Sequence, residues 1–349
     1  MRSLPFLLRL GVVGLVAGYL YERAGRTLPL EKDARERGRF AARPQDMTWL
    51  GWKDIAARTW RETMDDRLVS VGAGVAFYSL VALAPAVSVL VSLFGLIADP
   101  RDVVARLAPF LTALPDAARS IVVEQAARLS SQSNASLSIK LVAGLAIAAW
   151  SANAAIKSMF DALNVIYEED EKRSFLKLNA VSLLTTVSAI ALVTFAMFVI
   201  AVAPALIERA PFGAALETLV KLLRWPVFYL VAVGAVATLY WIGPSRRPAR
   251  FVWVLPGALL AALLWALASA GFSFYVARFG SYEATYGSLA AVVVFMTWLW
   301  ASACVILVGA ELNSELEHQT ARATTVGMPK PIGLRGAQMA DRIGPSSAR

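Results

Sequence analysis

The stretch GVAFYSLVALAPAVSVLVSLFGL, Gly74 to Leu96, establishes the fold class of this chain. It carries no charged residue and exceeds the roughly 20 helical residues needed to cross the ~30 Å hydrocarbon core of a bilayer. A single segment in lipid can satisfy its own backbone hydrogen bonds only as a helix. The stretch therefore predicts a transmembrane helix, although a tyrosine, three serines and a proline interrupt its apolar run.

The rest of the chain agrees with a membrane protein. Of 349 residues, 58% are hydrophobic and 17% charged, and the mean hydropathy of +0.58 is too high for an ordinary soluble chain of this size. We predict an all-α, polytopic membrane protein with a six-helix transmembrane core. The six long apolar segments lie at about 68–98, 139–156, 178–207, 222–243, 250–277 and 286–312.

The flanking segments differ in composition. Residues 1–21 form an apolar N-terminal helix that could be an anchor, an interfacial helix or an extra crossing, and residues 22–47 form a charged linker. The transmembrane domain spans 48–318, and its start mixes tryptophans with cations, which predicts an interfacial helix before the first main crossing. Residues 319–349 are predicted to form a polar, disordered tail.

The distribution of lysine and arginine predicts the orientation of the core. If both of its ends face the cytoplasm, the inner segments carry 21 Lys and Arg and the outer segments carry 9. The longest outer loop, about 99–140, alternates apolar and polar residues near helical period and predicts amphipathic helices over the outer surface.

Several motifs in a fixed order resemble the YihY/BrkB family of bacterial inner-membrane proteins, members of which were once labelled ribonuclease BN. The resemblance covers about Trp52 to Glu317 and rests on GVAFYSLVALAPAVSVLVSLFGLI, LPDAARSIV, AAWSANAAIKSMFDALNVIYEEDEKRSF, LPGALLAALLWALASAGFSFYV and YGSLAAVVVFMTWLWASACVILVGAELNSELE. It implies six membrane helices with both core ends in the cytoplasm. It supplies no catalytic residue to carry over.

Polar residues of the first crossing gather on one side of the predicted helix. At 100° per residue, Gly74, Tyr78, Ala82, Pro85 and Ser92 fall within about 80° of one another. We expect this stripe to face the protein interior or water, with a kink at the proline. It is either a packing seam or one wall of a substrate cavity.

The last crossing carries a comparable stripe that includes Tyr286, Thr297 and Glu311. Glu311, with Asn313 beside it, follows an apolar run directly and should lie near the cytoplasmic boundary. A structural ion pair with Arg173 or Arg247 and a role in proton or cation coupling are the two interpretations of this carboxylate.

The second crossing places two amides on one face, Asn153 and Asn164. Asn153 is the deepest polar group of that segment and needs a partner, either another helix or a substrate. The acidic run Glu168 to Glu171 that follows is expected to be a solvated, charge-rich loop.

Composition limits the possible chemistry. With one cysteine and one histidine, the chain offers no intramolecular disulfide and no evident metal centre, and it has no phosphate-binding loop. We expect no cofactor, no metal, no nucleic-acid partner and no enzymatic activity. The function expected is transporter-like or lipid- and envelope-handling at the bacterial inner membrane, with a lipid or small solute as partner and a homo-oligomer as a possible state. The alternatives are a non-transporting membrane scaffold and a membrane-associated ribonuclease.

Overall fold

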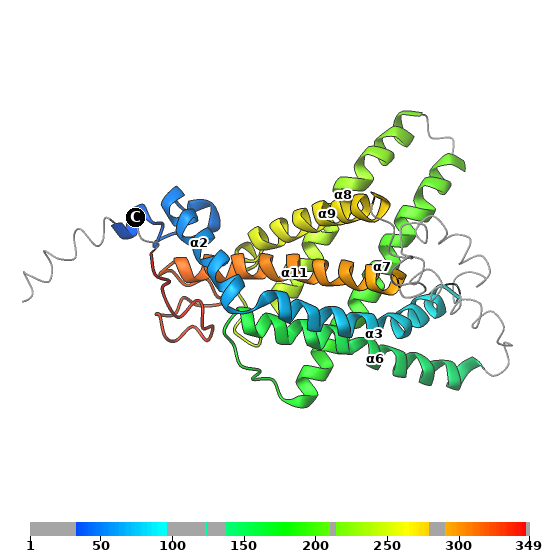
Figure 1. Cartoon of the computed structure of the whole chain (residues 1–349), viewed down its shortest axis with the longest axis horizontal. Helices are drawn as coiled ribbons and strands as arrows, with labels where there is room; N and C mark the ends of the chain where they lie inside the picture. Colours follow the sequence, from blue (N-terminus) through cyan, green and yellow to red (C-terminus); the bar gives the residue numbers. More distant parts are fainter. Residues whose placement is uncertain (1–32, 96–122, 124–136, 210–213, 279–289, 347–349) are drawn as a thin grey trace, which may run out of the picture.

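A computed structural model describes residues 33–95, 123, 137–209, 214–278 and 290–346 (Figure 1). The predicted N-terminal helix at 1–21, almost all of the predicted outer loop and Tyr286 lie outside these residues. The described part of the chain is helical and contains no strand, only an isolated bridge between Ala249 and Thr325.

Long helices occupy all six predicted apolar segments, so the all-α prediction is confirmed for the described residues. Three of them run well beyond the predicted bounds. The helices at 139–156 and 286–312 continue at their C-terminal ends through charged residues, and the helix at 222–243 begins earlier, at Ala214. The long helices are α3 (Leu68–Gly95), α6 (Leu137–Ile166), α7 (Phe175–Arg209), α8 (Ala214–Ile242), α9 (Leu255–Arg278) and α11 (Ala290–Gln319).

Length and apolarity single out a smaller set as candidate membrane spans among the described residues. Three helices qualify through Phe175–Leu192, Leu255–Tyr275 and Val292–Gln319. A fourth candidate is α2 (Trp49–Asp65) together with the start of α3, two helices related by a bend of 63°. The described residues thus contain three or four candidate spans.

The bend between α2 and α3 has a local cause. Thr48 caps the start of α2 by accepting a hydrogen bond from the Gly51 N–H at 3.1 Å. Arg67, directly after this helix, has a φ of 50°, a left-handed conformation that ends a right-handed helix. The chain therefore turns at this residue and starts α3 in a new direction.

The helices converge at one end of the molecule and diverge at the other (Figure 1). α11 lies in the middle and packs against α9, α3 and α2, while α3 also packs against α6. α7 and α8 lean away from α3 and α6 at the end remote from α2 (Figure 1). Large fully buried side chains of the core include Phe160, Tyr167, Tyr240, Trp253 and Leu307.

The buried face of α3 includes only part of the predicted stripe. Gly72, Val75, Ala76 and Ala82 are buried, whereas Gly74 and Tyr78 of the stripe are exposed. At 100° per residue the buried face lies roughly 100° around the helix from the centre of the predicted stripe. A second set of small residues, beginning with Gly72, permits the close approach to α11: a Cβ on Gly72 would lie 2.9 Å from Cys304 Sγ.

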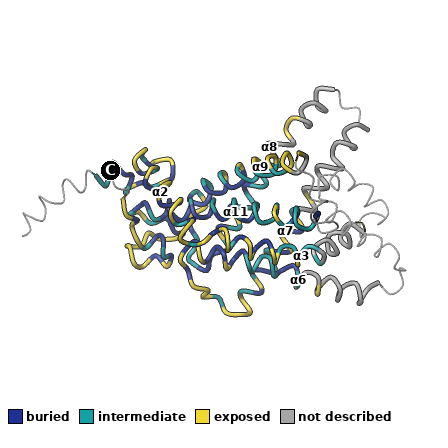
Figure 2. Tube along the Cα trace, viewed as in Figure 1, coloured by how far each residue is buried: buried dark blue, intermediate teal, exposed yellow. Residues whose placement is uncertain are grey.

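The predicted disordered tail is wrong for residues 320–346, which fold back over the convergent end and include several buried residues (Figure 2). Thr320 donates to the Ala41 carbonyl at 2.8 Å, and the Arg250 N–H donates to the Thr324 carbonyl at 2.8 Å. Arg335, only 3% exposed, donates to the carbonyls of Arg322 and Ala340. The polar residues of the tail therefore form hydrogen bonds with the rest of the protein and are not only solvated.

Residues 33–47 of the charged linker are likewise packed against the bundle. Arg37, 7% exposed, donates through Nη1 to both carboxylate oxygens of Asp54 on α2 at 2.9 Å. The Gln319 side chain at the end of α11 donates to the Arg37 carbonyl at 2.7 Å. This segment and the tail therefore close the convergent end together.

Candidate functional site

The last turns of α11 are polar and buried, which makes them the most unusual part of the described structure. Charged side chains are seldom buried unless they are paired. Each residue of this polar end must therefore be accounted for by its partners. The buried residues are Glu311, Asn313, Ser314, Glu315, Glu317 and Gln319.

Asn313 joins α11 to the start of α9. Its Oδ1 accepts from the Gly257 N–H at 2.7 Å, and its Nδ2 donates to the Val254 carbonyl at 2.9 Å. Both bonds satisfy backbone groups at the start of a helix, where the helix itself supplies no partner for the N–H. Gly257 and Gly309 bring the two backbones so close that a Cβ on either would overlap the other's carbonyl oxygen. Asn313 is therefore a structural connection between these helices.

Glu315 pairs with Arg58, a residue that composition assigned to the membrane surface. The Arg58 side chain is 3% exposed, and its Nε donates to the Glu315 carboxylate. The same guanidinium donates to Gln319 Oε1 and to the Pro345 carbonyl, each at 2.8 Å. One arginine thus ties together α2, α11 and the tail. Trp49 and Trp60 of the same helix are exposed.

Glu317 makes the second buried ion pair. Arg246 Nη2 lies 2.7 Å from Glu317 Oε1, and Thr324 donates to the other carboxylate oxygen at 2.8 Å. The Arg246 guanidinium also stacks on the Tyr167 ring, 4.0 Å from its centroid. Burial raises the pKa of the Tyr167 hydroxyl, and the carboxylates of Glu317 and Glu311 raise it further, so this phenol stays neutral at physiological pH.

Glu311 differs from its neighbours on α11. It is 1% exposed, and its Oε2 has no hydrogen-bond partner among the described residues. The predicted ion pair of Glu311 with Arg173 or Arg247 is wrong. Arg173 instead donates to Glu171 at 2.8 Å, and it also donates to the carbonyls at the end of α8. A buried carboxyl with an unused oxygen is energetically costly, which marks it as a functional candidate.

Other carboxylates, from the α2–α3 junction, from the loop after α6 and from α11 itself, add negative potential at the position of Glu311. These are Glu62, Asp66, Glu168 and Glu315. Desolvation, followed by the charges of Glu62, Glu168 and Asp65, raises the pKa of Asp66 to about 6. The Asp66 carboxyl can therefore change its charge close to physiological pH.

The two amides predicted on α6 both make contacts between elements. Asn153 Oδ1 accepts from the Thr186 hydroxyl on α7 at 3.1 Å, and its Nδ2 has no partner among the described residues. Asn164 accepts from the Ser245 N–H at 2.7 Å and donates to Glu171 at 3.2 Å. The interhelical interpretation of Asn153 agrees with its contact to α7.

The remaining predicted residues do not join this cluster. Tyr78 is 46% exposed on α3, Pro85 lies half-buried inside the same continuous helix, and Thr297 is exposed and hydrogen-bonded to the Val293 carbonyl of its own helix at 2.8 Å. Ser92 belongs to α3, but its side chain is outside the described part, as is all of Tyr286.

The acidic run after α6 is bound to neighbouring residues, and its predicted solvation is wrong for Glu169, whereas Glu171 is exposed. Glu169 is buried and accepts from the Gln338 N–H of the tail at 2.7 Å. Burial opposes ionisation of Glu171, but hydrogen bonds from the Arg173 side chain and backbone outweigh it and lower the pKa of Glu171 to about 2. Glu168 pairs with Arg342 at 2.7 Å.

Sequence reasoning missed Arg58, Arg246, Tyr167 and Arg37 as members of the polar end. The acids at 311, 315 and 317 were a usable signal, because three carboxylates at the end of an apolar helix require partners. Nothing in the local sequence, however, identifies which distant cations supply them.

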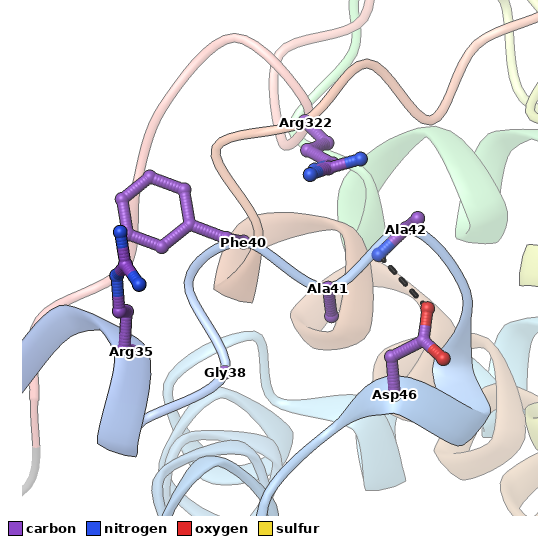
Figure 3. A pocket seen from close by; sticks show the side chains of 7 residues that line it. All are labelled: Arg35, Gly38, Phe40, Ala41, Ala42, Asp46 and Arg322. Atoms are coloured by element: carbon purple, nitrogen blue, oxygen red, sulfur yellow. Dashed lines mark hydrogen bonds between the residues drawn. The ribbon is translucent and has the colours of Figure 1, made fainter.

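Two cavities adjoin the convergent end. One, of about 420 Å³, lies between residues 35–46 and Arg322 of the tail, where Asp46 accepts from the Ala42 N–H at 3.2 Å (Figure 3). The other, of about 510 Å³, is lined by the ends of α7 and α8 and by the basic loops beside them. Among the described residues, no group of three or more His, Cys, Asp or Glu side chains is placed to hold a metal ion.

Comparison with known proteins identifies relatives across most of the chain. A family model described as "Virulence factor BrkB" matches residues 59–332. The ribonuclease-like protein YfkH of Bacillus subtilis (strain 168) is 32% identical over 181 residues, 50% of this chain and 65% of that protein. A UPF0761 membrane protein of Azoarcus sp. (strain BH72) is 30% identical over 258 residues, 72% of this chain and 60% of the relative.

Another UPF0761 membrane protein, from Tolumonas auensis, is 42% identical over 88 residues, 25% of this chain and 29% of that protein. The chain therefore spans less than two thirds of the length of each of these three relatives. No solved structure matches the chain.

Proposed function

Because the chain belongs to the virulence factor BrkB family of membrane proteins, we propose that it is a six-span protein of the bacterial inner membrane that moves a lipid or small solute. The convergent end, with α2, residues 33–47 and the tail, is its closed cytoplasmic gate. The cation distribution supports this orientation, because the loops at this end carry most of the Lys and Arg.

The observation that carries the proposal is Glu311, whose Oε2 is buried without a partner among the described residues. In a packing role this carboxyl would be expected to have a cation, as Glu315 and Glu317 do. An unpaired acid at the end of a membrane helix is instead suited to taking up a proton or a cation during a transport cycle. Opening of the gate would separate the Arg58–Glu315 and Arg246–Glu317 pairs.

Reconstitution in liposomes tests this function. Purified protein should scramble labelled lipids or pass a solute from a broad panel, and Glu311→Gln should alter the pH dependence of that flux. Asp170→Asn is the matched control, because it also removes one negative charge but from an exposed side chain. Absence of activity across the panel would contradict transport.

Topology is tested separately with reporter fusions. Fusions after residues 47 and 349 should report the cytoplasm, and a fusion within 278–285 should report the opposite side. Two reporters on opposite sides at 47 and 349 would contradict the six-span arrangement.

A non-transporting scaffold is the second candidate, and the extensive hydrogen bonding of the convergent end favours it. In a Cys304→Ser background, cysteine at position 311 would react with a membrane-impermeant thiol reagent if a water path opens there. Persistent protection at 311, together with the absence of flux, would support the scaffold.

Ribonuclease activity is proposed to be absent, despite the name of the Bacillus subtilis relative. Three of the acids after α6 already bind Arg342, Lys172 and Arg173. Degradation of RNA by pure protein, abolished by substitutions at Asp65, Asp66 or 168–171, would overturn this statement.

A further inference from the structure

The cavity at the start of α7 has an unusual composition. Among the residues that line its roughly 510 Å³, five are cations and none is an acid, and they meet at the ends of α7 and α8 and in the loops before and after these helices. The residues used below are Lys172, Arg173, Lys177, Trp241, Arg246 and Arg247.

Part of this positive charge is not neutralised within the described structure. Lys172, Arg173 and Arg246 pair with Glu169, Glu171 and Glu317. Lys177 and Arg247 form no ion pair with a described residue. Arg246 retains an unused donor as well: its side chain is 2% exposed, and its Nη1 is buried without a partner among the described residues. An anion in the cavity would accept from such donors.

The surroundings of the cavity indicate the source of the anion. Phe175 and Leu176, beside Lys177 at the start of α7, are 71% and 79% exposed. They begin the candidate span Phe175–Leu192, and Trp241 at the end of α8 is also exposed, with its Nε1 donating to the Ala249 carbonyl at 2.9 Å. Apolar and indole side chains beside cations are typical of the headgroup layer of a membrane.

We propose that this cavity binds the phosphate headgroup of an anionic phospholipid from the inner leaflet. The inference rests on the proposed cytoplasmic placement of the convergent end, but it does not require transport. The Arg247 N–H donates to the Gly336 carbonyl at 2.9 Å, and Gly336 lines the cavity, so a bound headgroup would also contact the docked tail.

Lipid binding by the full-length protein in neutral detergent tests the proposal. Native mass spectrometry would measure retention of phosphatidylglycerol and phosphatidylcholine by wild type and by Lys177→Gln/Arg247→Gln. Because each cation near a lipid surface contributes roughly fivefold to binding of anionic lipid, the double variant should bind phosphatidylglycerol about 25-fold more weakly. Binding of phosphatidylcholine should be weak in both proteins.

The control variant is Arg61→Gln/Lys330→Gln, which removes the same charge from two exposed residues outside the cavity lining. It should bind phosphatidylglycerol as wild type does, and Lys177→Arg/Arg247→Lys should retain most of the affinity. An equal loss in both neutralised pairs would overturn the proposal, because the effect would then follow net charge alone.

Competition with inorganic phosphate distinguishes a site for a lipid headgroup from a site for free phosphate. Little displacement of bound phosphatidylglycerol by millimolar phosphate supports a lipid site, whereas tight phosphate binding without preference for phosphatidylglycerol overturns it. Failure of the flux assay with intact, cavity-dependent lipid binding would contradict transport and leave this inference standing.

Discussion

At the scale of single residues, the convergent end depends on a few buried charges with specific partners. Arg58 and Arg246 each neutralise one carboxylate of α11, while Glu311 is left with an unused oxygen. Pairing determines the energetic role of each group, because removal of one partner leaves the other as an uncompensated buried charge.

Replacement of Arg58 by alanine tests this dependence. Arg58→Ala leaves the buried Glu315 carboxylate without its arginine partner and should destabilise the protein by about 3–5 kcal/mol. The measurement is the apparent Tm in detergent. Arg61→Ala, an exposed arginine on the same helix, should leave Tm nearly unchanged. Equal effects of the two substitutions would show that the pair contributes little.

The Asp66 carboxyl should make stability depend on pH. Its pKa rises from 3.8 to about 6 on folding, so the folded state binds the proton more tightly than the unfolded state. Stability should therefore decline as pH rises between about 4 and 6, and the penalty should remain at pH 7. Asp66→Asn should raise Tm at pH 7 and have little effect near pH 4. A Tm difference independent of pH would contradict the assignment.

At the scale of elements, close contacts between helices depend on particular glycines. The composition of a helix does not reveal which of its glycines these are. Gly72 faces Cys304 of α11, and Gly257 faces Gly309, whereas a Cβ added to Gly74 or Gly271 on the same two helices would meet nothing within 4 Å. On α3, and again on α9, one glycine lies in a close helix contact and a second faces open space. The second glycine of each helix can therefore serve as a control for the first.

The pair on α3 determines which face of the first crossing is inward. Gly72→Leu should disrupt the α3–α11 contact and reduce the yield of folded protein, because even a Cβ there would crowd Cys304 Sγ. Gly74→Leu should be tolerated, since that side is open. The measurement is the monodisperse fraction in detergent after expression at equal levels. Greater sensitivity at Gly74 would instead support an inward Tyr78 stripe.

The pair on α9 tests the backbone contact with α11. Gly257→Ala should destabilise strongly, because its methyl group would overlap the Gly309 carbonyl and the Asn313 side chain. Gly271→Ala meets no atom within 4 Å and should stabilise the helix by about 0.5–1 kcal/mol. Apparent Tm reports both changes, and similar shifts for the two variants would contradict the contact.

At the scale of the whole molecule, the two segments that flank the helices join to close one end. Residues 33–47 and 320–346 contact each other as well as the bundle: the Ala321 N–H donates to the Arg39 carbonyl at 2.7 Å. The two ends therefore differ: ion pairs and hydrogen bonds hold the converging end, whereas the helices spread apart at the other end (Figure 1).

Release of the tail should follow from loss of Arg335. Arg335→Ala leaves the Arg322 and Ala340 carbonyls without their donor, so the tail should be cut by trypsin faster than in wild type. Limited proteolysis of the full chain measures the rate. Lys330→Gln removes an exposed cation of the same tail and serves as the control, and because proline follows Lys330 it deletes no trypsin cleavage site. Equal protection in Arg335→Ala and wild type would show that the docking does not depend on this residue.

The amino-acid sequence alone was enough to predict the helical class, the six apolar helices and their order, the helix before them and the family. These follow from apolar length and local composition, because lipid leaves a single segment no other way to satisfy its backbone. The packed structure was needed to show which face of α3 is buried, which cations meet Glu315 and Glu317, and that residues 320–346 are packed. Lipid and protein interiors are similarly apolar, so hydropathy cannot distinguish an outward face from an inward one, and partners 70 to 280 residues apart leave no local pattern.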